Sequence, residues 1–202
     1  MKRAHRLLII LFLLALPAPA VMADVSSGDE CCVSAATEIE APCKKLIGAV
    51  RYNKDEMGLK QLDGEAQGAF LAGAEWAKAT AAQRQEFVKL FHGMFAGIAF
   101  PRIRKNFENL ETILYDAPAV DGDKATLGST IVILHPMKKQ EIRCTYDLKK
   151  GAAGWQVVDV TIQGDKSMLT NIRNDQVQPL LAKKGWDGIL EAMRKRVAKL
   201  KK

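Results

Sequence analysis

The side chains that most often carry chemistry are few in this 202-residue sequence. After residue 23 it has two histidines, His92 in FHGMF and His135 in HPMK, and neither belongs to a catalytic motif. Asp159 is the one carboxylate in the middle of the valine-rich segment WQVVDVTI. It can act as a general base in a pocket or accept backbone hydrogen bonds, and we favour the structural role. Because G-x-S-x-G, H-E-x-x-H and Gly-rich phosphate loops are missing from the sequence, we predict no enzyme activity.

The four cysteines, Cys31, Cys32, Cys43 and Cys144, allow three disulfide pairings, and the sequence does not choose among them. A bond between the adjacent Cys31 and Cys32 would be strained, so one from either of them to Cys43 is geometrically easier. Cys144 is then a buried thiol. The CC-x10-C spacing matches no usual zinc pattern, and we predict neither a metal nor a cofactor.

The first 23 residues have the build of a secretory signal peptide, with basic MKRAHR, ten apolar residues LLIILFLLAL and a small-residue end VMA. The apolar run is too short to span a bilayer, which takes about 20 residues. We therefore expect a soluble exported protein, with a flexible start over residues 24–33 and a single domain over 34–202. Export also places the cysteines in an oxidising compartment.

The formal charge is +7, of which about +4 remains without the first 23 residues. A mild excess of positive charge is typical of soluble proteins in general. The alternative interpretation is a weak attraction to an anionic membrane surface or an acidic partner. The lysines are scattered or terminal and no aromatic residues interleave with them, so we predict no nucleic-acid binding.

Helical spacing of apolar residues predicts two early helices, a short one over 43–52 after Pro42 and a stronger one over 80–100. Thr80 and Gln83 form a capping box at the start of the second. We expect Pro101 to end or kink that helix. Its apolar stripe contains Phe87, Leu90, Phe91, Met94, Phe95 and Ile98.

Period-two alternation predicts four antiparallel strands in series, each with one apolar face. In the fourth, Val158, Val160 and Ile162 are expected on that face. Gly128, inside the second strand, indicates a bend or a bulge. The four segments are LETILYDA (110–117), KATLGSTIVILH (124–135), QEIRCTYDL (140–148) and WQVVDVTI (155–162).

A second apolar stripe follows the segment GDKS, from Met168 to Leu181. We expect a kink at Pro179, a stop at Gly185 and a last helix from Asp187. The predicted class is α+β, with a curved antiparallel sheet of about four strands covered by N-terminal and C-terminal helices. The space between sheet and helices can be filled or hollow, and the pattern alone favours a filled core.

The segment GWQVVDVTIQG, followed by SMLTNIRNDQ and KKGWDGIL, resembles the MlaC family of periplasmic phospholipid carriers, also known as toluene-tolerance proteins. The upstream segment AEWAKATAAQRQEFVKLF and the strand DKATLGSTIVI extend the resemblance to roughly residues 70–200. Ile172 stands where the family usually has tyrosine, and GDKS is one residue longer than the usual Gly-x-Ser. These differences lie at the expected pocket rim and bear on headgroup preference.

The resemblance implies a phospholipid as cargo, with its acyl chains in an apolar cavity between sheet and helices. It also implies a shuttle between an inner-membrane ABC transporter with an MCE-domain subunit and an outer-membrane lipoprotein associated with porins. Such a carrier maintains the lipid asymmetry of the outer membrane, and we expect it to act as a monomer. The alternatives are an exported isomerase or hydrolase that uses Asp159, and a protein-interaction module with a filled core.

On this basis we predict a lipid-binding wall from the second helix, the strands and the segment after the hinge. Arg173 is interpreted as a contact to the headgroup phosphate or a partner protein, with a plain surface ion pair as the alternative. The predicted wall residues are Phe91, Met94, Phe95, Ile98, Ile131, Ile133, Ile142, Tyr146, Val158, Val160, Ile162, Met168, Leu169 and Ile172.

Overall fold

The computed structural model describes residues 27–200, with side chains from residue 35 on. The predicted signal peptide, residues 1–23, lies outside the described residues. Over 27–200, every helix is too short or too polar to cross a membrane. The helical elements are α1 (Ser27–Arg51), α2 (Asp55–Leu59), α3 (Gly64–Ala72), α4 (Glu75–Lys78), α5 (Ala81–Met94), η1 (Phe95–Ala99), α6 (Phe100–Asn106), α7 (Met168–Ile172), η2 (Arg173–Val177) and α8 (Gln178–Leu200).

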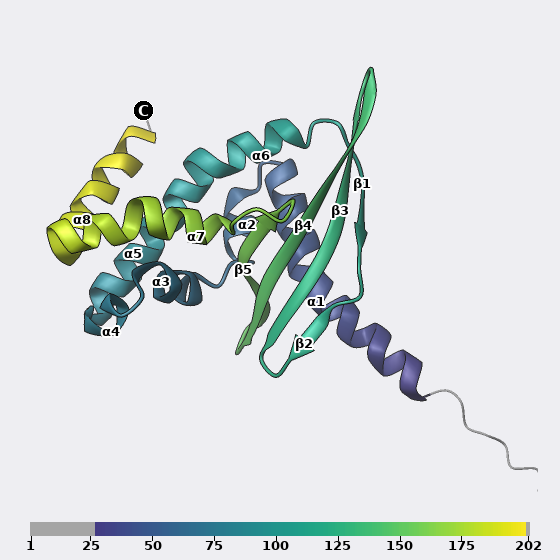
Figure 1. Cartoon of the computed structure of the whole chain (residues 1–202), viewed down its shortest axis with the longest axis horizontal. Helices are drawn as coiled ribbons and strands as arrows, with labels where there is room; N and C mark the ends of the chain where they lie inside the picture. Colours follow the sequence, from purple (N-terminus) through teal and green to yellow (C-terminus); the bar gives the residue numbers. More distant parts are fainter. Residues whose placement is uncertain (1–26, 201–202) are drawn as a thin grey trace, which may run out of the picture.

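The strands form one curved antiparallel sheet in the order β1-β3-β4-β5, which confirms the predicted α+β class (Figure 1). The described chain has a fifth strand that was not predicted from the sequence, because the short β2 lies in the connection between the first two predicted strands. It pairs with the beginning of β3. The strands are β1 (Leu110–Tyr115), β2 (Ala119–Asp121), β3 (Lys124–His135), β4 (Lys138–Gly151) and β5 (Gly154–Ile162).

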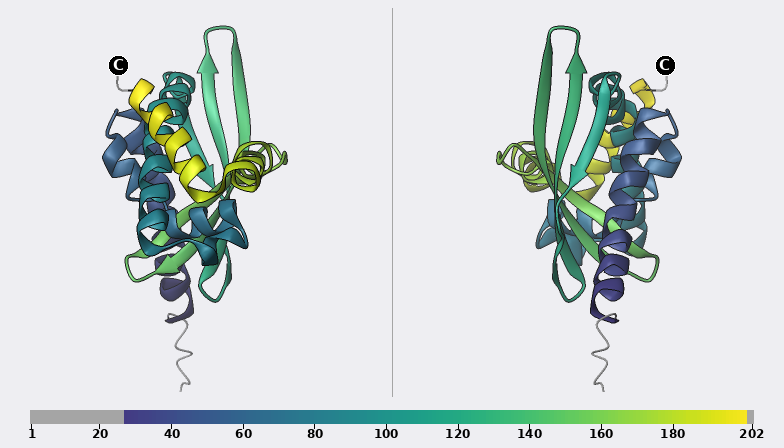
Figure 2. Two further views of the ribbon diagram at one scale, coloured as in Figure 1. Left: turned by 90° about the vertical axis from the view of Figure 1, so that its left-hand side faces the viewer. Right: turned by 90° about the vertical axis from the view of Figure 1, so that its right-hand side faces the viewer.

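The helices gather on one face of the sheet, as the two side views also show (Figure 2). The inward side chains of β4 alternate as predicted, and Cys144, Tyr146 and Leu148 are buried. Charged side chains such as Arg143 and Asp147 lie on the opposite, exposed face. This face needs no cover because polar side chains keep their hydration there.

A β-bulge changes which residues of β5 face the helices. The register of β4 and β5 shifts between Asp147 and Leu148, which places Val157 opposite Leu148. Val157 is therefore buried, whereas Ile162 is 51% exposed at the end of the strand. Val158, Val160 and Ile162 line the sheet-facing cavity described below, on the side predicted for them. The bulge adds one residue to the strand, so Val157 is buried as well, which a strict alternation does not predict.

Gly128 lies in a regular stretch of β3 opposite Thr145, so no bulge is formed at this glycine. A Cβ atom there would lie only 2.0 Å from Oδ2 of Asp116. Asp116 forms an ion pair with Arg143 across the exposed face of the sheet. The glycine therefore makes room for a carboxylate.

Helix α1 is longer than predicted, because it runs unbroken from Ser27 through Pro42 to Arg51. It includes residues 27–33, where we expected a flexible start; these residues have no apolar stripe by which a helix is detected. Cys32 and Cys43 lie on the same helix, about 16 Å apart along its axis, which is far beyond the reach of a disulfide bond. The favoured pairing of Cys31 or Cys32 with Cys43 was therefore wrong. Cys43 and Cys144 are buried free thiols, as predicted for Cys144. Burial raises their pKa values to about 12 and about 11, respectively.

The long helices are interrupted at places set by proline and glycine. Two π-helical segments, η1 and η2, end two residues before Pro101 and Pro179. A proline lacks the N–H for a helical hydrogen bond and its ring crowds the carbonyl four residues earlier, and a wider turn relieves both problems. Pro101 therefore does not end the helix. Gly185, with φ of 63°, separates the two halves of α8 where a stop was predicted.

Candidate functional site

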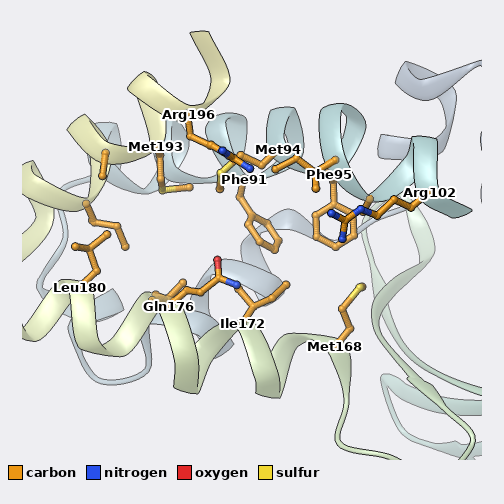
Figure 3. A pocket seen from close by; sticks show the side chains of 15 residues that line it. Phe91, Met94, Phe95, Arg102, Met168, Ile172, Gln176, Leu180, Met193 and Arg196 are labelled. Carbon is orange, nitrogen blue, oxygen red and sulfur yellow. The ribbon is translucent and has the colours of Figure 1, made fainter. Parts of the chain in front are cut away.

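One cavity lies among helices and is here called the helix chamber (Figure 3). Side chains from α5, η1 and α6 form one wall, and those from α7, η2 and α8 form the others. Its volume is about 540 Å³. The lining residues are Phe91, Met94, Phe95, Ile98, Ala99, Arg102, Met168, Ile172, Gln176, Val177, Leu180, Ile189, Ala192, Met193 and Arg196.

The second cavity, here called the sheet chamber, lies between the curved sheet and the helices α1, α3, α6 and α7. Its volume is about 500 Å³. The lining is again mostly apolar, with a few polar groups. The lining residues are Leu46, Ile47, Val50, Leu62, Gln67, Phe95, Phe100, Ile103, Asn106, Phe107, Ile131, Ile142, Cys144, Tyr146, Val157, Val158, Asp159, Val160, Ile162, Asp165, Lys166, Met168 and Asn171.

The two chambers adjoin at Phe95 and Met168, which line both. Phe95 begins η1, and Met168 begins α7. Both π-helical segments contribute to the helix chamber, through residues such as Ile98 and Gln176. Because π turns are wider than α turns, they displace the helix wall at the level of the cavity. The helix chamber therefore lies at the two places where a proline prevents a regular α-helix.

Residues 50–195 match a protein-family model described as MlaC protein. The chain belongs to the MlaC family. A structure described as the phospholipid-binding protein from Ralstonia solanacearum in complex with a phospholipid has a similar fold. Its TM-score is 0.66 at 18% sequence identity, with 83% of this chain and 99% of that chain covered.

A protein of unknown function from Mycobacterium tuberculosis aligns with a TM-score of 0.33 at 14% identity, covering 84% of this chain and 93% of that chain. That likeness is too weak to support an inference. No curated protein sequence matched the chain. The MlaC membership and the α+β fold therefore stand on the family model and the first structure.

Most of the wall residues expected from the MlaC resemblance line a chamber, and they divide between the two. Phe91, Met94, Ile98 and Ile172 line the helix chamber, and Phe95 and Met168 line both. The rest of those that line a cavity, Ile131, Ile142, Tyr146, Val158, Val160 and Ile162, belong to the sheet chamber. Contact of these residues with a lipid stays a prediction.

Ile133 and Leu169 line neither chamber. They are 2% and 0% exposed and are packed in the core. Arg173 also lines neither chamber, and its guanidinium lies over the ring of Phe70, 5.2 Å from the ring centroid. Arg173 has no ion pair within residues 35–200, and its contact with a headgroup or a partner protein stays a prediction.

One wall of the sheet chamber and the charged groups of the helix chamber were not predicted from the sequence. Leu46, Ile47 and Val50 line the sheet chamber from α1, and their helical spacing was the available signal. Arg102 and Arg196 line the helix chamber from α6 and α8. They are 94 positions apart, so no local pattern joins them.

Asp159 connects β5 to the helix that follows the hinge. Its Oδ1 accepts hydrogen bonds from the backbone N–H of Leu169 at 3.1 Å and of Val160 at 2.7 Å. Ser167 caps α7 by accepting from the N–H of Thr170 at 3.0 Å. Asp159 is 7% exposed, and its carboxylate lies at the positive end of α7. These contacts favour the structural role over that of a general base.

A second hydrogen-bond network at the sheet chamber connects the side chains of Gln67 and His92 with the backbone carbonyl of Val158. Gln67 Nε2 donates to the Val158 carbonyl at 2.9 Å, so its Oε1 is left to accept from His92 Nε2 at 3.1 Å. Gln67 is 1% exposed. Burial lowers the pKa of His92 below its ordinary value of 6.5. His92 is therefore a neutral hydrogen-bond donor that fixes α3 against α5.

We expect the unfolding free energy to fall as the pH drops through about 6.5, the ordinary histidine value. The sign follows because the unfolded chain binds the His92 proton more readily than the folded chain. The stability is therefore full above this pH and declines until the lowered folded pKa is reached. Denaturant midpoints across this range should show a smaller pH slope in His92→Gln than in the parent protein. Equal slopes would contradict this role of His92.

Proposed function

We propose that this protein is a phospholipid carrier that holds one acyl chain in each of the two adjoining chambers. The observation that carries this proposal is the pair of apolar cavities that meet at Phe95 and Met168 in a member of the MlaC family. The phospholipid-binding title of the Ralstonia solanacearum structure, which has a similar fold, supports the same class of cargo.

The chamber sizes are suited to acyl chains. Two chains of about 15 CH₂ groups each occupy roughly 800 Å³, near the upper end of ordinary ligand pockets. Cavities of about 540 and 500 Å³ can each accept one such chain. Each buried CH₂ contributes about 0.8 kcal/mol, so burying both chains stabilises them by at most about 24 kcal/mol relative to exposure to water.

A more specific proposal concerns the route along which the protein carries the lipid. We propose that the protein works in the periplasm and shuttles phospholipid between an inner-membrane ABC transporter complex with an MCE-domain subunit and an outer-membrane lipoprotein–porin complex. This traffic would maintain outer-membrane lipid asymmetry. The protein would act as a monomer, as a binding protein rather than an enzyme, and with phospholipid as cargo instead of a cofactor.

The first test is native mass spectrometry of the protein purified without detergent from its own compartment, followed by solvent extraction. We expect a stoichiometric added mass that disappears on extraction and is identified as a phospholipid. A bare mass that persists after incubation with phospholipid vesicles would overturn the carrier proposal. It would favour the alternative of a protein-interaction module.

A further inference from the structure

The helix chamber has two charged residues among its lining residues, and both are arginines. Arg102 projects from α6 and Arg196 from α8, and Figure 3 shows both side chains extending inward over the cavity. Both residues are exposed, so they lie at the rim rather than among the apolar walls. The one polar uncharged side chain of the lining is that of Gln176. The rim of this chamber is therefore cationic, with no carboxylate in the lining.

These two arginines have no ion pair or hydrogen bond within residues 27–200, unlike the arginines two positions away. Arg104 pairs with Asp55 at 2.6 Å, and Arg194 pairs with Glu86 at 2.6 Å. On both α6 and α8, the arginine outside the chamber thus has a carboxylate partner and the arginine at the chamber has none. The fold leaves two guanidinium groups available at one apolar cavity.

The pairing chemistry of guanidinium indicates what fits there. Its planar group of N–H donors matches phosphate, to which it can donate two parallel hydrogen bonds. Below the rim, residues such as Met94, Ile98 and Met193 offer an apolar surface for a hydrocarbon chain. The site as a whole therefore suits an amphiphile with an anionic phosphate head and an acyl tail.

The sheet chamber lacks this charge pattern. The charged residues in its lining are Asp159, Asp165 and Lys166, so negative and positive groups are mixed. Asp165 and Lys166 are neighbours in the hinge, and their charges largely cancel for an approaching anion. A phosphate is consequently favoured at the rim of the helix chamber.

We propose that Arg102 and Arg196 together bind the phosphate of the phospholipid cargo at the rim of the helix chamber. This inference rests on the proposed carrier function and adds the position and the chemistry of headgroup recognition. The pair selects for phosphate, which all phospholipids share, and not for the group attached beyond it. Neutral lipids with the same acyl chains are therefore discriminated against.

The test compares two lipids that differ in the phosphate headgroup. The protein is incubated with vesicles that contain phosphatidylethanolamine and diacylglycerol with identical acyl chains, and the bound lipids are quantified by mass spectrometry. We expect the parent protein to prefer the phospholipid by about tenfold, because each guanidinium adds a charge-assisted contact to the phosphate that diacylglycerol cannot make. The double variant Arg102→Gln/Arg196→Gln should bind both lipids nearly equally and retain its unfolding temperature.

The matched control is Lys183→Gln/Lys184→Gln, which removes the same charge from exposed positions of α8 that line neither chamber. It should keep the parent preference. An unchanged preference in the arginine variant, or an equal loss in the lysine variant, would overturn the inference. If the parent protein takes up neither lipid, the carrier function itself fails. If it takes up both without preference, the carrier function stands and the arginine site fails.

A separate titration with inorganic phosphate distinguishes a headgroup site from a site for the free ion. We expect no stoichiometric binding of inorganic phosphate, because the acyl chains supply most of the binding energy. Stoichiometric binding that is lost in Arg102→Gln/Arg196→Gln, with an unchanged lipid preference, would identify a free-anion site. That result would overturn the proposed headgroup contact.

Discussion

Replacing Met94 and Val160 together by tryptophan should leave the protein folded and largely free of bound lipid. Met94 lines the helix chamber and Val160 lines the sheet chamber, so each indole occupies space proposed for one acyl chain. Loss of room for only two CH₂ groups, at about 0.8 kcal/mol each, weakens binding about tenfold. The two replacements together should lower the lipid content further, which native mass spectrometry of the purified variant measures.

Stability measurements separate cavity filling from damage to the fold. A larger side chain in a well-packed core costs about 1–3 kcal/mol, whereas in a cavity it gains contacts without displacing neighbours. We therefore expect lipid-free Met94→Trp and Val160→Trp to unfold no more easily than lipid-free parent protein. Met57→Trp, at a 55% exposed position outside both chambers, is the control and should keep its lipid. Unchanged lipid content in the folded double variant would refute the assignment of both walls.

Asp159→Ala should strongly destabilise the junction between β5 and α7. It leaves the N–H groups of Leu169 and Val160 without their acceptor, and Leu169 is 0% exposed. Hydrogen bonds to charged groups contribute about 1.5–3 kcal/mol, so the unfolding free energy should fall by about 2–3 kcal/mol. Thermal unfolding followed by circular dichroism should show a midpoint lower by roughly 5–10 °C.

Asp159→Asn is the matched control because an amide oxygen can still accept from Leu169. It should cost less than about 1 kcal/mol, since the lost charge also removes a repulsion. Asp147 lies directly opposite Asp159, and burial and then the Asp159 charge raise the pKa of the Asp147 carboxyl. In Asp159→Asn this pKa should move back towards its ordinary value. Loss of a measured turnover in Asp159→Asn with unchanged lipid content would instead favour the isomerase or hydrolase alternative.

The sequence correctly predicted the features that depend only on residues close together in the chain, such as helix caps and the alternation within one strand. The capping box of Thr80 and Gln83 is formed in both directions, at 3.0 and 3.1 Å. The inward side chains of β4 alternate as expected because a single strand determines that period. The faces of β5 did not follow the same rule. Val157 is buried through its pairing with β4, and that register is a property of two strands together.

The apolar walls of the candidate site could be predicted from the sequence, but its two chambers and its charged rim could not. Phe91, Met94 and Ile98 share a helical stripe, so their common face was evident from spacing alone. The helix chamber is lined in part by η1 and η2, where the chain keeps its helical course past a proline. Whether a proline ends a helix or widens it depends on the packing around it. The rim formed by Arg102 and Arg196 likewise exists only once α6 and α8 are packed together.

The two chambers also make hydrostatic pressure a sensitive variable for this fold. Pressure favours the state of smaller volume, and the volume decrease on unfolding, about 20–100 mL/mol in proteins, scales with the internal void that is eliminated. Space in the cavities of about 540 and 500 Å³ that water does not fill adds to this decrease. Hydrocarbon inside them removes this void from the folded state. Compression therefore unfolds the hollow form at lower pressure than the filled form, even where their thermal midpoints are close.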